Sequence, residues 1–187
     1  LVSDINTPLL VGTLREDENA KDLCYNSATL FLGDARIEST YDKIHLVPFG
    51  EYIPLKNIFS FLEKVAPAPI GDVARGKRYN VFSFTVVRVA KDESMTWRLA
   101  KKVRFSALIC FEDIFPGMAR KFVKEGAAFL VNMTNDAWYK KTSAGWQHAQ
   151  GSIFRAVENR VNVIRAANTG VSCFIDQKGM VIDNVKD

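Results

Sequence analysis

The sequence predicts an α/β fold in which two mixed β-sheets are layered between helices. Strand patterns joined by turn residues predict β-hairpins near both ends of the chain, whereas the middle alternates buried strands with helical patterns. The 187 residues, of which 48% are hydrophobic and 25% charged, suffice for one globular domain with a substantial core.

The N-terminal part predicts a small group of strands. Residues 9–13 form an apolar strand pattern, and residues 28–32 are expected to pair with 36–40 across a Gly-Asp turn. Residues 41–52 have no regular period and contain a proline and a glycine, so we expect an ordered loop. A short helix, a rigid proline-rich link and a further loop are then predicted at 57–64, 66–69 and 71–76.

The rest of the chain predicts strands interrupted by two helices. Apolar runs and alternation predict strands at 81–89, 103–109, 128–132, 161–166, 172–175 and 180–182. A further strand is expected to follow the polar turn at 91–94 and to end near residue 100. One helix has Pro116 in its first turn and ends at Gly126. The other covers 146–160, where apolar residues recur at helical spacing.

Charge and cysteine content exclude several function classes. The net charge is +4 and the basic residues are scattered, so we expect no nucleic-acid partner. The two histidines and the three cysteines, which form no CxxC pair, give no zinc signature. No apolar run reaches the roughly 18 residues that span a bilayer. Because the chain starts without methionine and enters a strand pattern almost at once, we expect a fragment of a longer protein.

The strongest functional candidate is Cys110, which ends an apolar strand pattern and precedes an acidic segment. A thiol at a strand-to-helix junction is held rigidly, and the positive end of the following helix favours the thiolate. The other interpretation is core filling, because free cysteine is among the most buried residue types. We interpret Cys24 and Cys173 in that second way.

The loop at 41–52 carries a lysine, a histidine and a glutamate within nine residues. An isolated loop lysine is usually a solvated charge. A lysine that is held beside a carboxylate and a thiol can, however, favour the thiolate and stabilise the oxyanion of a tetrahedral intermediate, and we expect this of Lys43. Lys43, Cys110 and a glutamate together therefore predict attack of a thiolate on an acyl carbon. We expect His45 to order this loop, and His148 to form hydrogen bonds rather than to catalyse.

Four separated motifs resemble the carbon–nitrogen hydrolase (nitrilase) superfamily. In chain order they are Y-D-K-I-H-L-V-P-F-G-E-Y, L-I-C-F-E-D-I-F-P, N-M-T-N-D-A-W and Q-H-A…R-A-V-E-N-R…R-A-A-N-T-G-V-S. Within the superfamily, the first and third motifs resemble the apolipoprotein N-acyltransferases, which are bacterial inner-membrane enzymes with a nitrilase-like domain on the periplasmic side. The resemblance covers residues 9 to about 179 and implies a nitrilase-like α-β-β-α sandwich of two mixed sheets flanked by helices, truncated at the N-terminus.

The resemblance implies a Glu–Lys–Cys catalytic set, with Lys43 and Cys110 as the lysine and the cysteine and Glu51 as a supporting acid near the lysine. The superfamily's catalytic glutamate lies in a W-P-E segment upstream of the lysine. No glutamate before Lys43 follows Trp-Pro, so we expect that residue, and the membrane helices, to lie before Leu1. The chain alone is then expected to lack its general base.

Three further residues are implied around the nucleophile. Phe111 and Glu112 follow it directly, and Phe111 stands where a tyrosine is often found, which removes a hydroxyl but keeps the ring. Trp138, in the N-D-A-W motif, is implied to lie near the mouth of the site in contact with lipid chains. The chemistry needs no metal and no organic cofactor.

Together these features predict an acyltransferase that works through a thioester on Cys110. The implied donor is a phospholipid acyl chain, and the implied acceptor is the N-terminal amine of an S-diacylglyceryl-cysteine apolipoprotein. The implied location is the bacterial inner membrane, with this domain on the periplasmic side and membrane contact through segments outside this chain. Two other interpretations stay open: a soluble amidase of the same superfamily that hydrolyses a small amide, and a non-catalytic remnant domain.

Overall fold

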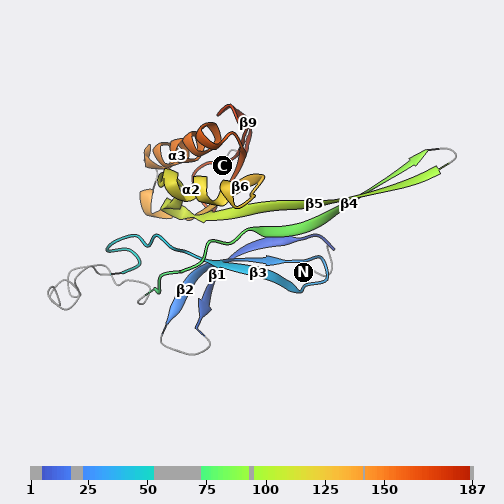
Figure 1. Ribbon diagram of the computed structural model, residues 1–187. Helices are drawn as coiled ribbons and strands as arrows, with labels where there is room; N and C mark the ends of the chain where they lie inside the picture. The colour runs from blue at the N-terminus through green and yellow to red at the C-terminus, as the bar shows by residue number, and fades with distance from the viewer. Residues whose placement is uncertain (1–5, 18–22, 53–72, 93–94, 141, 186–187) are drawn as a thin grey trace.

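The computed structural model describes residues 6–17, 23–52, 73–92, 95–140 and 142–185 (Figure 1). The predicted helix at 57–64 and the link at 66–69 lie outside these residues. The elements in chain order are β1 (Leu9–Glu16), β2 (Cys24–Phe31), β3 (Ile37–Asp42), β4 (Phe82–Asp92), β5 (Met95–Ile109), the 3₁₀-helix η2 (Cys110–Ile114), α2 (Pro116–Lys124), β6 (Phe129–Thr134), the 3₁₀-helix η3 (Ala137–Tyr139), α3 (Ala144–Asn159), β7 (Asn162–Ala167), β8 (Ser172–Ile175) and β9 (Val181–Val185).

The smaller sheet contains β1, β2 and β3 in that order, and both of its strand pairs are antiparallel. The predicted hairpin between 28–32 and 36–40 is confirmed as β2 and β3. Its turn is closed by a hydrogen bond from the N–H of Ala35 to the carbonyl oxygen of Leu32. Among the described strands this sheet is therefore antiparallel rather than mixed.

The larger sheet has six strands in the order β4-β5-β6-β7-β8-β9. Its central strands β5, β6 and β7 are parallel, and the remaining pairs are antiparallel, so this sheet is mixed as predicted. Helices α2 and α3 connect the parallel strands, as strand–helix–strand units require. Figure 1 shows the layers: α2 and α3, then the sheet that contains β5, then the smaller sheet.

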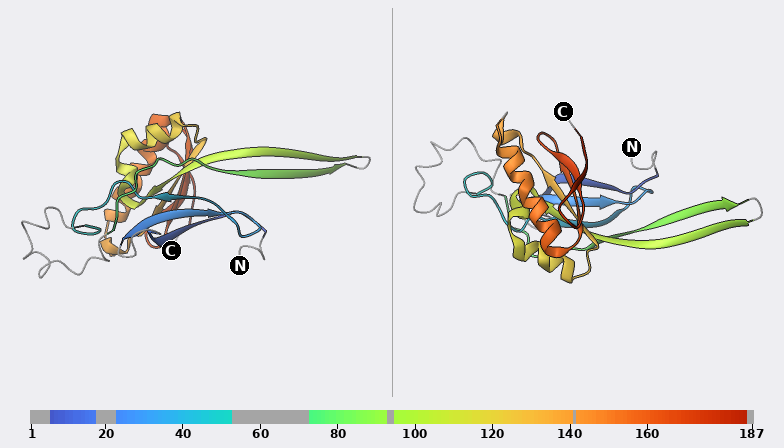
Figure 2. Two further views of the ribbon diagram at one scale, coloured as in Figure 1. Left: turned by 60° about the horizontal axis from the view of Figure 1, so that its bottom comes forward. Right: turned by 90° about the horizontal axis from the view of Figure 1, so that it is seen from above.

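One predicted pair of strands is a single strand. The sequence predicts a break near residues 101–102, but β5 runs for 15 residues and pairs with β4 without interruption from Phe82↔Phe105 to Asp92↔Met95. Figures 1 and 2 show that the far end of this hairpin extends beyond the layered body as a two-stranded ribbon. A ribbon outside the core has no buried face to maintain, so the exposed Lys101 and Lys102 do not end the strand.

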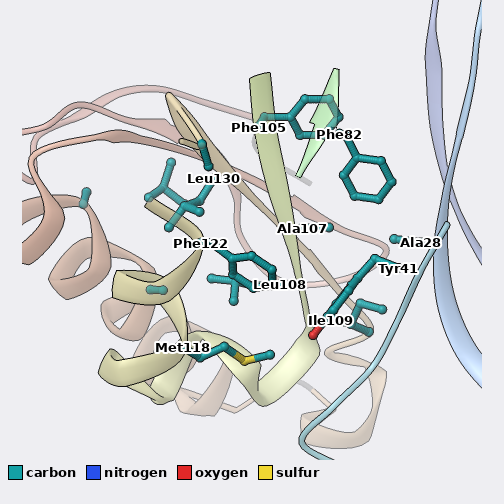
Figure 3. Close-up of a cluster of buried hydrophobic side chains, with 14 of the residues drawn as sticks. Ala28, Tyr41, Phe82, Phe105, Ala107, Leu108, Ile109, Met118, Phe122 and Leu130 are labelled. Atoms are coloured by element: carbon teal, nitrogen blue, oxygen red, sulfur yellow. The ribbon is translucent and has the colours of Figure 1, made fainter. Parts of the chain in front are cut away.

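The core lies on both faces of β5. Figure 3 shows Leu108 on the side of Phe122 in α2, whereas Ile109 points toward Tyr41 of the smaller sheet. Successive residues of a strand face opposite sides, so one apolar run fills the space between three layers. Edge-on contact between the rings of Tyr41 and Phe122, 5.5 Å between centroids, joins the smaller sheet to α2.

Helix α3 confirms the predicted helix at 146–160, but the predicted apolar face is only partly buried. Trp146 and Phe154 are about 60% exposed, whereas His148, Ser152 and Arg155 are buried. The polar side chains face inward because a cluster of charged groups lies beneath the helix. Apolar periodicity thus identified the helix but only part of its buried face.

Candidate active site

Cys110 follows the last residue of β5 and begins η2, at the predicted junction of a strand and a helix. Its side chain is half-buried. Its φ of 54° lies in the left-handed region, which residues other than glycine rarely adopt. Such a conformation persists where surrounding contacts over-determine it, and it is common at functional sites. One of these contacts is the hydrogen bond from Asn132 Nδ2 to the carbonyl oxygen of Cys110, at 3.0 Å.

Lys43 and Glu51 form an ion pair within the loop that follows β3. Lys43 is 1% exposed, and its Nζ lies 2.7 Å from Glu51 Oε2. Glu51 also accepts hydrogen bonds from Asn26 Nδ2 and from the N–H of Val47, both at 2.8 Å. A buried ammonium group is costly unless it is paired, so this lysine is not a solvated surface charge. The structure brings these two predicted site residues together.

Glu112 is fully buried and is surrounded by hydrogen-bond donors. Its Oε1 accepts from the N–H groups of Ile44 and His45, at 2.7 and 3.0 Å. Its Oε2 accepts from the N–H of Ile109 at 2.9 Å. The Tyr41 hydroxyl lies 2.9 and 3.0 Å from the two oxygens. Burial raises the pKa of Glu112, and the hydrogen bonds from these backbone N–H groups oppose that rise.

The contacts of Glu112 connect the two segments that carry the candidate residues. Ile44 follows Lys43 directly, and Ile109 directly precedes Cys110. One carboxylate therefore fixes the backbone beside the lysine and the backbone beside the thiol. The sequence implies Glu112 as a neighbour of the nucleophile, and the geometry describes it as the link between two loops.

Aromatic rings gather around Phe111, the residue that follows the thiol. The Phe111 ring stacks on the His148 imidazole with 4.8 Å between centroids, and it lies 6.4 Å from the Tyr139 ring. Burial raises the pKa of Tyr139 to about 12, and the charge of the Cys110 thiolate adds to that rise. Tyr139, the residue after Trp138, thus lies beside Phe111, the residue after Cys110. Trp138 itself is 67% exposed, and its contact with lipid chains stays a prediction.

A buried group of four charged residues lies behind this site. We call Arg165, Asp113, Asp136 and His148 the Arg165 cluster. Arg165 pairs with Asp113 through Nη1 at 3.1 Å and with Asp136 through Nη2 at 2.8 Å. The His148 ring nitrogens lie 2.8 Å from Asp136 Oδ1 and 3.1 Å from Asp113 Oδ1. Each of the two carboxylates thus contacts both Arg165 and His148, so the buried charges are paired.

Sequence reasoning did not identify the Arg165 cluster as a unit. His148 forms hydrogen bonds as expected, but its partners lie 12 and 35 residues away along the chain. One signal was present, because Arg165 interrupts an apolar strand pattern at a position expected to be buried. The acidic partners lie in separate motifs, and only the tertiary structure brings them together.

Stability is expected to fall as the pH rises from about 6.5 to about 9. Burial alone lowers the pKa of His148, but hydrogen bonds to Asp113 and Asp136 outweigh burial and the repulsion by Arg165, and raise the pKa to about 9. In this pH window the folded state keeps a proton that the unfolded state releases. The free energy of unfolding therefore falls by about 2 kcal/mol across the window, after allowing for solvent screening.

This pH dependence is checked by thermal unfolding at pH 6.5 and pH 9.5, compared between the wild type and His148→Gln. The variant is expected to be less stable at the lower pH and to lose less stability between the two. The comparison also removes the contribution of Cys173, whose pKa burial raises. Equal losses in the two proteins would show that His148 does not carry the effect.

Two other features are absent from the described residues. Within the ranges given above, no helix is long and apolar enough to cross a membrane. In the same part of the chain, no group of three or more His, Cys, Asp or Glu side chains is arranged to hold a metal ion.

The sequence is similar to a known family and to several known proteins. A family model described as carbon–nitrogen hydrolase matches residues 1–186. The apolipoprotein N-acyltransferase of Geobacter metallireducens is 40% identical over 182 residues, which cover 97% of this chain and 32% of that protein. Apolipoprotein N-acyltransferase 2 of Treponema denticola is 35% identical over 187 residues, which cover 98% and 33%. The chain spans about a third of the length of these curated relatives.

Solved structures share the fold. An amidase from Nesterenkonia sp. matches 98% of this chain and 59% of its own with a TM-score of 0.62 and 18% identity. Nit3 of Saccharomyces cerevisiae, a member of branch 10 of the nitrilase superfamily, matches the same shares with a TM-score of 0.63 and 17% identity. At these identities the likeness concerns the fold alone, and it confirms the predicted nitrilase-like architecture.

Proposed function

Because the chain belongs to the carbon–nitrogen hydrolase family, we propose that it is the nitrilase-like domain of an apolipoprotein N-acyltransferase. The relatives at 35 and 40% identity support the acyltransferase branch. The observation that carries the chemistry is the contact set of Glu112, which holds the backbone beside Lys43 and the backbone beside Cys110.

The proposed reaction has two acyl transfers. In the first, the Cys110 thiolate attacks the ester carbonyl of a phospholipid acyl chain; a C–S bond forms, the C–O bond breaks and the protonated lysophospholipid leaves. In the second, the α-amine of an S-diacylglyceryl-cysteine apolipoprotein attacks the thioester; an amide forms and the thiol is regenerated. The general base is the glutamate expected upstream of this chain.

Lys43 supplies positive charge for the oxyanion in both steps. Its pairing with Glu51 at 2.7 Å keeps the ammonium group in one orientation, so little reorganisation is needed when the tetrahedral intermediate forms. We propose further that Phe111 and the exposed Trp138 form the apolar side of the site, where an acyl chain would lie. The domain would then work beside a bilayer, on the periplasmic side of a bacterial inner membrane.

Covalent labelling tests this proposal. The full-length protein is treated with a long-chain thioester analogue of the acyl donor, digested and analysed by mass spectrometry. We expect the peptide that contains Cys110 to gain the acyl mass, Cys110→Ala to remain unlabelled and Cys24→Ser to be labelled as in the wild type. Absence of an acyl adduct on Cys110 would reject the proposal.

The acceptor is tested in the same preparation by adding a diacylglyceryl-cysteine peptide. Transfer to the peptide amine supports the acyltransferase. Release of free fatty acid without N-acylated peptide would instead assign the domain to the hydrolytic members of the superfamily. Labelling without transfer or hydrolysis would show that the chain accepts an acyl group but does not pass it on.

A further inference from the structure

The conformation of Cys110 depends on contacts on both sides of its backbone. On the N-terminal side, Glu112 holds the N–H of Ile109. On the C-terminal side, the Cys110 carbonyl oxygen accepts a hydrogen bond from Asn132 Nδ2 at 3.0 Å, and the same amide nitrogen lies 3.4 Å from the carbonyl oxygen of Leu108. Asn132 is fully buried in β6. Its amide is thus directed at the junction of β5 and η2, where the thiol lies.

The orientation of the Asn132 amide is set by Arg165. Arg165 Nη1 donates to Asn132 Oδ1 at 2.7 Å, so the oxygen of the amide faces the guanidinium and its nitrogen faces Cys110. The sheet register explains the alignment, because Leu108, Asn132 and Arg165 lie side by side on the parallel strands β5, β6 and β7.

Arg165 is itself immobilised. Asp113 and Asp136 bind its two terminal nitrogens, and its Nε donates to the carbonyl oxygen of Val171 at 3.1 Å. A planar guanidinium held at three nitrogens cannot turn away from its neutral acceptor. A second contact reaches the same turn from the cluster, since His148 stacks against Phe111, the residue after the thiol.

We propose that Asn132 is a positioning residue, which holds Cys110 in its left-handed conformation and is itself oriented by the Arg165 cluster. This inference rests on the proposed role of Cys110 as nucleophile. The Asn132 side chain bonds to the carbonyl groups of Leu108 and Cys110 and to Arg165, so its proposed action on the thiol is through the Cys110 backbone. Its loss is therefore expected to change how fast the thiol reacts rather than how well the donor binds.

The test measures acylation of Cys110 by the long-chain thioester in the full-length protein carrying Asn132→Ala or Asn132→Asp. Aspartate still accepts from Arg165 but has no donor for the Cys110 carbonyl oxygen. We expect both variants to lower the kcat of acylation roughly 100-fold and to leave the KM for the thioester nearly unchanged. Small displacements of a reacting group have effects of that size.

The matched control is Ser106→Ala. Ser106 is fully buried in β5, and its hydroxyl donates to the carbonyl oxygen of Asn80 at 2.9 Å, away from the turn. This variant also loses one buried hydrogen bond, so its unfolding temperature is the reference for the Asn132 variants. We expect it to keep the wild-type kcat. If its kcat falls as far as that of Asn132→Ala, or if the Asn132 variants raise KM and leave kcat unchanged, the proposal is wrong.

A second readout separates this inference from the proposed function. Iodoacetamide alkylates a thiol without any acyl donor. We expect Cys110 of Asn132→Asp to react roughly tenfold more slowly than Cys110 of the wild type, because the thiol is no longer held in one orientation. Absence of a thioester adduct in the wild type would overturn the proposed function alone. Equal alkylation rates in the wild type and the variant would overturn the positioning role.

Discussion

Replacement of Lys43 by methionine is expected to slow acylation of Cys110 by about 10²–10³-fold, the usual effect of removing one donor to a developing oxyanion. Methionine fills a similar volume, so the buried space stays occupied. Glu51 loses its ion pair but keeps the hydrogen bonds from Asn26 and Val47. The rate is measured as the burst of acyl-enzyme in the full-length protein, beside a thermal unfolding curve.

The control for this variant is Lys121→Met. Lys121 lies on α2 with its Nζ 3.7 Å from the centre of the Tyr79 ring, so its replacement also removes a lysine that has a specific contact. The acylation rate of this control is expected to match the wild type. Acylation at the wild-type rate in Lys43→Met would mean that another group carries the oxyanion.

Replacement of Glu112 by alanine is expected to destabilise the domain by about 4 kcal/mol, since each buried donor left without an acceptor costs about 1–3 kcal/mol. The donors are the N–H groups of Ile44, His45 and Ile109 and the Tyr41 hydroxyl. For a domain of this size that loss corresponds to a fall of about 10 °C in the unfolding temperature.

Two further variants sharpen that prediction. Glu112→Gln keeps the shape of the side chain but turns an NH₂ group toward one set of donors, so an intermediate loss is expected. Glu125→Ala removes an exposed glutamate just after α2 and is expected to leave the unfolding temperature unchanged. If Glu112→Ala melts like Glu125→Ala, the carboxylate does not hold the two loops together.

Turn residues and hydrophobic periodicity predicted the elements that depend on neighbouring residues in the sequence. The hairpin of β2 and β3, the strand–helix units around α2 and the stop at Gly126, which has a φ of 101°, follow from turn residues and periodicity. The continuity of β5 and the inward face of α3 did not follow. Each depends on what lies across the next layer, and a sequence window does not contain that information.

The candidate site was predictable to a similar degree. Motifs located Cys110, Lys43 and Glu51, and the structure pairs the last two. The contacts of Glu112 were not predictable, because its main partners are backbone N–H groups, which every residue but proline carries. The Arg165 cluster was also missed, since its members are drawn from four elements or loops that meet only in the folded protein.

The Arg165 cluster has a consequence for the electrostatic field at the thiol. With His148 protonated, its two positive and two negative charges sum to zero. A neutral set of alternating charges has no monopole, and its potential decays much faster with distance than that of a single ion. The Arg165 cluster, which we propose places the Cys110 turn through Asn132, therefore adds no net charge beside that turn. In the proposed mechanism, Lys43 stabilises the oxyanion and the Arg165 cluster places the nucleophile, so the two tasks are assigned to separate groups.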